Sequence, residues 1–211
     1  ITETKMHFSE SDIVVIDDGS GDDTAKIAAL ENVHILRHPF NMGIGASFQT
    51  GCQFACLLGY DYIVRVDADG QHDPRFIRKI LEPVAANDAD IVIGSRFLGD
   101  SQYTSSFLRL IGIHIIALAL KVISNRKITD PTSGFCAMNR KAFEFFSKNC
   151  PDEYPEPEII VFHKEFRIKE VPISIQKRKE GISSITTFKS MYYMVLVLLS
   201  LFIHIFKKEI Q

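Results

Sequence analysis

Two carboxylates, Asp67 and Asp69, stand one residue apart at the end of a β-type run and directly before Gly70. A buried strand over residues 62–66 would deliver both at its carboxyl end, the edge where an open α/β sheet holds its ligands. Gly70 permits a sharp turn. The turn would let both carboxylates converge on one hard cation that also coordinates a ligand phosphate. The alternative is a solvated acidic loop at the strand end.

The elements that position this turn alternate between strand and helix patterns. Short apolar runs predict strands at residues 13–16, 33–36, 62–66 and 91–93. Helix-forming stretches between them predict helices at residues 25–30, at 46–58 and from Pro74 onward. This order predicts an α/β fold through about residue 97, with a Rossmann-like, mostly parallel sheet flanked by helices.

Composition limits the class of protein. The chain has 211 residues, 46% of them hydrophobic, enough for one domain with a sizeable core. A net charge of -2 argues against a nucleic-acid partner. The four cysteines lack the spacing of a metal site and are expected to be core thiols in a reducing cytoplasm. The amino end carries no signal-peptide pattern.

Two later segments are apolar nearly all round: residues 107–123 and the tail at 191–206, which ends in Lys207 and Lys208. Such helices are deeply buried or lie against a membrane. The tail is shorter than the roughly 20 residues needed to span a bilayer. We therefore expect an interfacial or re-entrant helix at 189–211 after a domain at 1–188, at the cytoplasmic face of the membrane. A true span and a core helix are the alternatives.

Five motifs in order resemble those of family 2 glycosyltransferases, which have the GT-A fold. They lie at residues 16–20, 41–45, 67–71, 94–96 and 130–135. The apolar helices and the segments 154–158 and 178–184 resemble the bacterial branch related to dolichyl- and polyprenyl-phosphate sugar transferases. The resemblance implies an inverting enzyme of cell-surface polysaccharide synthesis. It would move a sugar from a nucleotide-diphosphate donor to a polyprenyl phosphate or lipid-linked glycan.

The resemblance also implies donor-binding residues. They are Ile16, Asp17, Asp18, Asp67, Ala68, Asp69, Gln71, Arg96 and Arg178. Asp18 would accept a hydrogen bond from the base, and Asp67 would contact the ribose hydroxyls. Asp69, with Asp67, would bind Mg²⁺ or Mn²⁺ between the two phosphates.

Several of these roles have alternatives. Asp17 would support the loop, although both it and Asp18 could instead cap a helix. Gln71 is a candidate phosphate or supporting contact. His72 could extend the metal site, but an exposed turn histidine is the preferred interpretation. Arg96 would grip phosphate oxygens. Arg178 would do so from a loop that closes over the donor, unless that loop is a solvated charge run.

On the acceptor side, Asp130 is the candidate base or acceptor-orienting group, with Ser133 and the Gly134 amide as phosphate contacts. A phosphate acceptor would need no strong base. Glu156 and Glu158 are the alternative acidic pair, or the first turn of a helix.

The amino end departs from the family pattern, which begins with an apolar strand and a helix. Residues 1–11 are mostly polar, so we expect neither element, and the first strand of the sheet is expected to be missing. Ser184 stands where lysine is common in the family. A non-catalytic nucleotide-sugar-binding or scaffold protein, a transferase for a soluble glycan, and a response-regulator type of domain remain alternatives. A homo-oligomer is a further candidate partner.

Overall fold

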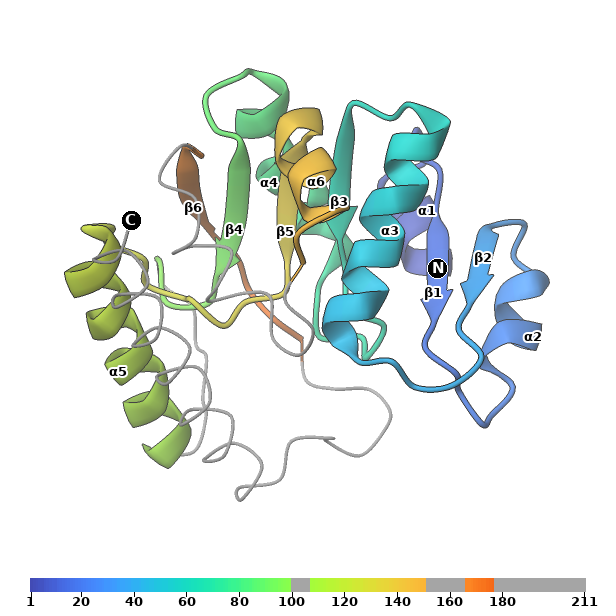
Figure 1. The fold of residues 1–211 in the computed structure, drawn as a ribbon, viewed down its shortest axis with the longest axis horizontal. Helices are drawn as coiled ribbons and strands as arrows, with labels where there is room; N and C mark the ends of the chain where they lie inside the picture. Colours follow the sequence, from blue (N-terminus) through green and yellow to red (C-terminus); the bar gives the residue numbers. More distant parts are fainter. Residues whose placement is uncertain (100–106, 151–165, 177–211) are drawn as a thin grey trace.

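The computed structural model describes residues 1–99, 107–150 and 166–176 (Figure 1). In chain order the elements are α1 (Thr2–His7), β1 (Val14–Asp17), α2 (Thr24–Ala29), β2 (His34–Arg37), α3 (Ile44–Leu58), β3 (Tyr62–Arg65), the 3₁₀ helix η1 (Pro74–Phe76), α4 (Ile77–Ala85), β4 (Ile91–Ser95), α5 (Phe107–Ser124), β5 (Cys136–Asn139), α6 (Arg140–Phe146) and β6 (Ile168–Pro172). None of the helices within these ranges combines the length and the apolar character that crossing a bilayer requires.

The strands form two sheets. β1 and β2 pair in parallel, with Val14 opposite His34. The second sheet has the order β3-β5-β4-β6. β5 runs antiparallel to β3 and β4, whereas β4 and β6 are parallel, so β3, β4 and β6 point the same way. The predicted α/β fold is confirmed, with one reversed strand that was not predicted.

Helices cover both faces of the larger sheet. On one face α3 and α6 pack against Ile91, Ile93 and Met138, and on the other face α4 packs against Val92 and Ala137 (Figure 1). Ile116 and Leu120 of α5 belong to the first of these two core clusters. Successive residues of β4 and β5 therefore point to opposite faces, as pleated strands require. With both faces covered, all five residues of β4 are buried.

At the amino end the structure differs from the expectation in one respect. Residues 2–7 form the short helix α1, where neither a helix nor a strand was expected. Phe8, directly after this helix, is buried in the core cluster with Ile77 and Ile80, and this contact explains why a polar segment is ordered. No strand precedes β1 in the described residues, as predicted.

Helix α5 is both a core helix and an exposed apolar one. Ile113, Ile116 and Leu120 are buried in the core. A second row on the same helix leaves apolar side chains exposed, namely those of Ile111, Ile115, Leu118 and Val122. One face of α5 therefore packs against the domain, and the other presents apolar surface. The apolar tail lies outside the described residues.

Candidate active site

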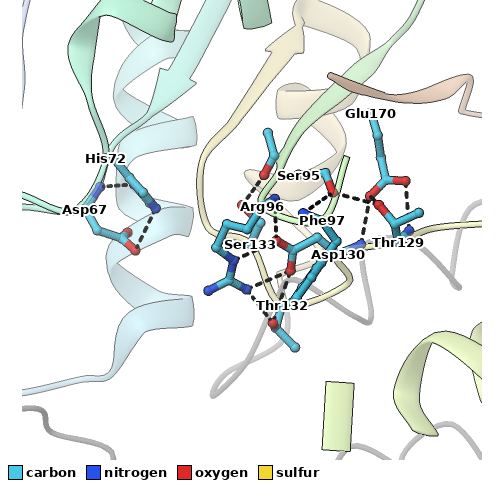
Figure 2. A network of polar contacts seen from close by, with 11 residues as sticks. Asp67, His72, Ser95, Arg96, Phe97, Thr129, Asp130, Thr132, Ser133 and Glu170 are labelled. Atoms are coloured by element: carbon cyan, nitrogen blue, oxygen red, sulfur yellow. Dashed lines mark hydrogen bonds and ion pairs between the residues drawn. The ribbon is translucent and has the colours of Figure 1, made fainter. Parts of the chain in front are cut away.

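The reversed direction of β5 brings together segments that are far apart in sequence. Cys136, the first residue of β5, lies opposite Arg65 in β3 and Ile93 in β4. The loop before β5 therefore lies at the edge where β3 and β4 end. Asp67 follows β3 and Arg96 follows β4, so the predicted motifs at 67–71, 94–96 and 130–135 meet at one edge (Figure 2).

Asp67 contacts His72 at both ring nitrogens. The Asp67 backbone N–H donates to Nδ1 of His72 at 3.0 Å, and Oδ2 of Asp67 lies 3.8 Å from Nε2 (Figure 2). Asp67 Oδ1 lies 3.4 Å from a guanidinium nitrogen of Arg65. The Asp67 side chain is 38% exposed, so the carboxylate is held by the protein and open to a ligand.

His72 is not the exposed turn histidine that was the preferred interpretation. Its side chain is only 10% exposed and stacks on Phe135, with ring centroids 4.8 Å apart. Burial lowers the pKa of His72, although the nearby charges of Asp67 and Asp69 oppose this shift. The imidazole is therefore neutral near pH 7, with Nδ1 accepting and Nε2 carrying the proton.

Gly134 lies directly against Asp67. A Cβ atom built on Gly134 would stand 2.9 Å from Oδ2 of Asp67 and 3.0 Å from Nη2 of Arg65. A side chain at this position would therefore require Asp67 and Arg65 to shift.

The turn after Asp67 is built as predicted. Gly70 adopts a φ of +74°, and Asp69 Oδ1 accepts a hydrogen bond from the Gln71 N–H at 3.0 Å. Ala68 is exposed between the two carboxylates. The Gln71 carbonyl accepts from the Gln176 N–H at 2.9 Å, so the last described residue of the chain is held at this turn.

The carboxylates fit a metal that is completed by its substrate. No group of three or more His, Cys, Asp or Glu residues in the described ranges is arranged to hold a metal alone. Mg²⁺ is commonly bound by one or two carboxylates plus substrate phosphates, and Asp67 and Asp69 provide two partly exposed carboxylates.

Arg96 and Asp130 form an ion pair that was not predicted. Nε and Nη2 of Arg96 bond the two oxygens of Asp130 at 2.6 and 2.7 Å, and Nη2 also donates to Oγ1 of Thr132 at 2.8 Å (Figure 2). Asp130 is fully buried, and Arg96 is 11% exposed. The guanidinium of Arg96 and the carboxylate of Asp130 therefore form a buried ion pair, and their roles toward phosphate and acceptor stay predictions.

Glu170 in β6 anchors the same loop, and it was missed from the sequence. Its carboxylate accepts from the backbone N–H groups of Thr129 and Asp130, both at 2.8 Å, and from the Thr129 hydroxyl at 3.0 Å. Ser133, expected to contact a phosphate, donates its hydroxyl to the Gly94 carbonyl at 2.6 Å. The only sequence signal for the role of Glu170 was the presence of an acidic residue within residues 168–172.

The predicted nucleotide-binding end lies in the other sheet. Asp18 accepts from the N–H groups of Met42 and Gly43, both at 2.9 Å, and pairs with Nδ1 of His38 at 2.7 Å. Burial alone would raise the pKa of Asp18, but these hydrogen bonds lower it below its ordinary value. The motifs at 16–20 and 41–45 are thus brought together.

Asp17 supports this turn, as predicted. Its side chain is buried, with Oδ1 accepting from the Ser20 N–H at 2.8 Å and Oδ2 lying 3.1 Å from Nε of Arg37. Ile16 precedes it within β1. Helix α2 begins at Thr24, so neither Asp17 nor Asp18 caps it. Three further predicted site residues, Glu156, Glu158 and Arg178, lie outside the described residues.

Comparison with known proteins decides the family. A family model described as glycosyl transferase family 2 matches residues 4–146. The chain belongs to glycosyl transferase family 2.

The names of two relatives indicate that they act on lipid phosphates. Polyprenol monophosphomannose synthase of Mycolicibacterium smegmatis is 30% identical over 186 residues, 82% of this chain and 70% of the relative. The UDP-N-acetylglucosamine–dolichyl-phosphate N-acetylglucosaminyltransferase of Methanococcus voltae is 28% identical over 195 residues, 82% of this chain and 78% of the relative.

Solved structures with a similar fold agree with the GT-A fold. Glucosyl-3-phosphoglycerate synthase from Mycobacterium tuberculosis, in complex with Mn²⁺ and UDP-glucose, superposes with a TM-score of 0.64 at 18% identity. The match covers 89% of this chain and 67% of that chain.

Proposed function

We propose that this family 2 glycosyltransferase moves a sugar, with inversion, from a nucleotide-diphosphate donor to a polyprenyl or dolichyl phosphate or a lipid-linked glycan. The observation that carries the proposal is the meeting of Asp67 with Gly134, which joins the donor-side turn to the acceptor-side loop. The names of the relatives support a lipid-phosphate acceptor. Since one relative transfers mannose and the other N-acetylglucosamine, the proposal leaves the sugar open.

We further propose that Asp69 and Asp67 hold Mg²⁺ or Mn²⁺. The support is their position on a turn, partly exposed, and the Mn²⁺ present in the structure of the glucosyl-3-phosphoglycerate synthase. When bound, the ion would offset the negative charge of the donor diphosphate.

Residues of this chain would orient the donor at its base end and at its phosphate end. Asp18 would receive the base on the loop that Asp17 supports, with Ile16 and Ala68 lining the path along the strand ends. Gln71 would support the phosphate end. Gln176 is hydrogen-bonded to Gln71, and Arg178 stands two residues further along the sequence. Arg178 is therefore the proposed guanidinium for the donor phosphates.

For a phosphate acceptor, no strong base is required, because the attacking oxygen is already anionic near neutral pH. This agrees with an Asp130 that is buried in an ion pair with Arg96. We propose that this pair and Ser133 hold the loop that presents the Gly134 amide to the acceptor. For a hydroxyl acceptor, Glu156 and Glu158 are the proposed acidic residues.

The acceptor places the reaction at a membrane, and we propose the cytoplasmic face. Residues 1–188 would form the transferase domain and residues 189–211 the membrane-associating segment. The exposed apolar row on α5 supports contact with lipid at the same side as the acceptor.

The test is donor binding and turnover by the full chain. We expect UDP-, GDP- or dTDP-sugars to raise the melting temperature more with Mn²⁺ than without it, and polyprenyl phosphate to be glycosylated. Asp69→Asn should abolish the Mn²⁺-dependent part of binding. The matched control is Asp88→Asn, because Asp88 is exposed at the opposite end of the sheet, where it makes a 3.9 Å ion pair with Lys169. Metal-dependent binding without turnover on any lipid acceptor would favour the scaffold alternative. Unchanged binding in Asp69→Asn would contradict the metal assignment.

A further inference from the structure

Both ring nitrogens of His72 face the same residue, Asp67. Nδ1 accepts the backbone N–H of Asp67 at 3.0 Å, and Nε2 faces the carboxylate of the same residue at 3.8 Å. The first contact fixes the backbone of Asp67. The second directs an N–H group at its side chain.

The ring has little freedom to do anything else. One face stacks on Phe135 with an interplanar angle of 12°, and the backbone of His72 forms an antiparallel bridge with Ile175. The charged groups around the ring are Asp67, Asp69, Arg65 and Arg96. A ring needed only for packing would be served by a phenyl group, whereas here a buried polar ring is aimed at a partly exposed carboxylate.

We propose that His72 is a positioning residue for Asp67, which sets the direction of the carboxylate toward the metal and the donor diphosphate. The inference rests on the proposed function. At 3.8 Å the Nε2–H group is beyond hydrogen-bond length, so a small rotation of the Asp67 side chain would bring Oδ2 into a full hydrogen bond. Oδ1 lies beside the Arg65 guanidinium at 3.4 Å, so the carboxylate would be held from two sides. Residues that orient a metal-binding carboxylate from behind commonly contribute about 10- to 100-fold in metal affinity.

Three substitutions separate the two contacts from packing. His72→Phe keeps the stacking on Phe135 and removes both nitrogens. His72→Gln retains a donor near the position of Nε2, and His72→Asn retains an acceptor near the position of Nδ1. The measured quantity is the affinity of the full chain for UDP, GDP and dTDP by calorimetry, each with and without Mn²⁺, together with the melting temperature.

We expect His72→Phe to reduce the Mn²⁺-dependent gain in nucleotide affinity by about tenfold or more and to leave metal-free affinity unchanged. His72→Gln should recover most of this loss, and His72→Asn should recover less, because Asn lacks the Nε2 donor. A purely structural ring would lower the melting temperature of all three variants without this ranking.

Two outcomes overturn the inference in distinguishable ways. If His72→Phe binds Mn²⁺ and nucleotide like the wild type, or if the losses follow melting temperature alone, His72 does not position Asp67. If the wild type binds none of UDP, GDP and dTDP, with or without Mn²⁺, the proposed function fails and this inference fails with it.

Discussion

At the scale of single residues, the approach of Gly134 to Asp67 sets the geometry of the site. A methyl group at Gly134 would press on the ends of two side chains, Asp67 and Arg65, and not on backbone. We therefore expect Gly134→Ala to move the Asp67 carboxylate and to weaken Mn²⁺-dependent nucleotide binding by about tenfold. The free energy of unfolding should change by less than about 1 kcal/mol, because the side chains can shift.

Gly21→Ala is the matched control, since a Cβ at Gly21 meets nothing within 4 Å. Calorimetry and chemical denaturation of both variants check the prediction. Nucleotide binding that is intact in Gly134→Ala would mean that the carboxylate does not need its present direction.

The sequence predicts the strand-end turn at residues 67–70 because its signals are adjacent: a β-type run, two acidic residues and a glycine. The burial of His72 could not be predicted in this way. Its burial depends on Phe135, which reaches it only through the pairing of β5 with β3. Position in sequence alone therefore favoured an exposed turn residue.

At the scale of elements, the loop before β5 is anchored from two strands. Arg96 after β4 and Glu170 in β6 both bind the segment that contains Thr129 and Asp130. β5 itself was not predicted, because its sequence, Cys-Ala-Met-Asn, contains no β-branched or aromatic residue. Without that strand, the sequence could place the motif at 130–135 near the site only by family resemblance.

This anchoring predicts the behaviour of Asp130→Asn. The substitution removes the Asp130 carboxylate from its ion pair with the largely buried Arg96, and breaking a buried pair typically costs about 3–5 kcal/mol. We expect a loss of about 3 kcal/mol in the free energy of unfolding, measured by denaturant titration, together with weaker activity. Asp61→Asn is the control, because Asp61 is 77% exposed in its pair with Arg140 and should contribute less than about 1 kcal/mol. A fully stable Asp130→Asn protein that lacks activity would instead support the catalytic base.

A second ionic group joins the opposite ends of three strands. Asp90, before β4, accepts from Arg167 before β6 and, at 2.8 Å, from Asn139 at the end of β5. The hydrogen bonds from Arg167 hold the pKa of Asp90 at about 2, well below its ordinary value near 4. Because the folded-state pKa is the lower one, the stabilisation is complete above about pH 4 and is lost as the pH falls toward 2.

We therefore expect Asp90→Asn to lower the free energy of unfolding by roughly 2 kcal/mol at pH 6 and by much less at pH 2.5. Denaturant titrations at the two pH values check this. Asp73, whose pKa is also about 2, remains in both proteins, so some acid sensitivity should persist in the variant. A difference that does not depend on pH would contradict the assignment of the shift to Asp90.

At the scale of the whole molecule, the described domain presents apolar surface on α5, and the sequence continues into the segment at 189–211, whose apolar run is followed by Lys207 and Lys208. A protein ending at residue 188 should lose most binding to anionic liposomes and turnover of lipid acceptors, and should keep nucleotide binding. Burial of apolar side chains and attraction of Lys207 and Lys208 to anionic headgroups both favour the full chain on the membrane.

Liposome flotation at moderate salt measures this difference. Neutral liposomes are the control for the lysine contribution, because binding to them depends only on burial of apolar side chains in the lipid. Equal flotation of the full and shortened chains would locate membrane contact elsewhere, with α5 as the remaining apolar surface.

The division of the strands into two sheets has a consequence for how a donor is bound. Asp18 belongs to the β1–β2 pair and Asp67 to the larger sheet, while α3 packs against β1 and β3. A nucleotide sugar that contacts both carboxylates is therefore a bivalent ligand. Its ribose connects the part of the donor bound at Asp18 to the part bound at Asp67. Its affinity depends on effective concentration, which is greatest when the spacing of the two sheets matches the length of the nucleotide. Substitutions in α3 that alter this spacing would weaken intact donors and leave the affinities for nucleoside and for pyrophosphate alone unchanged.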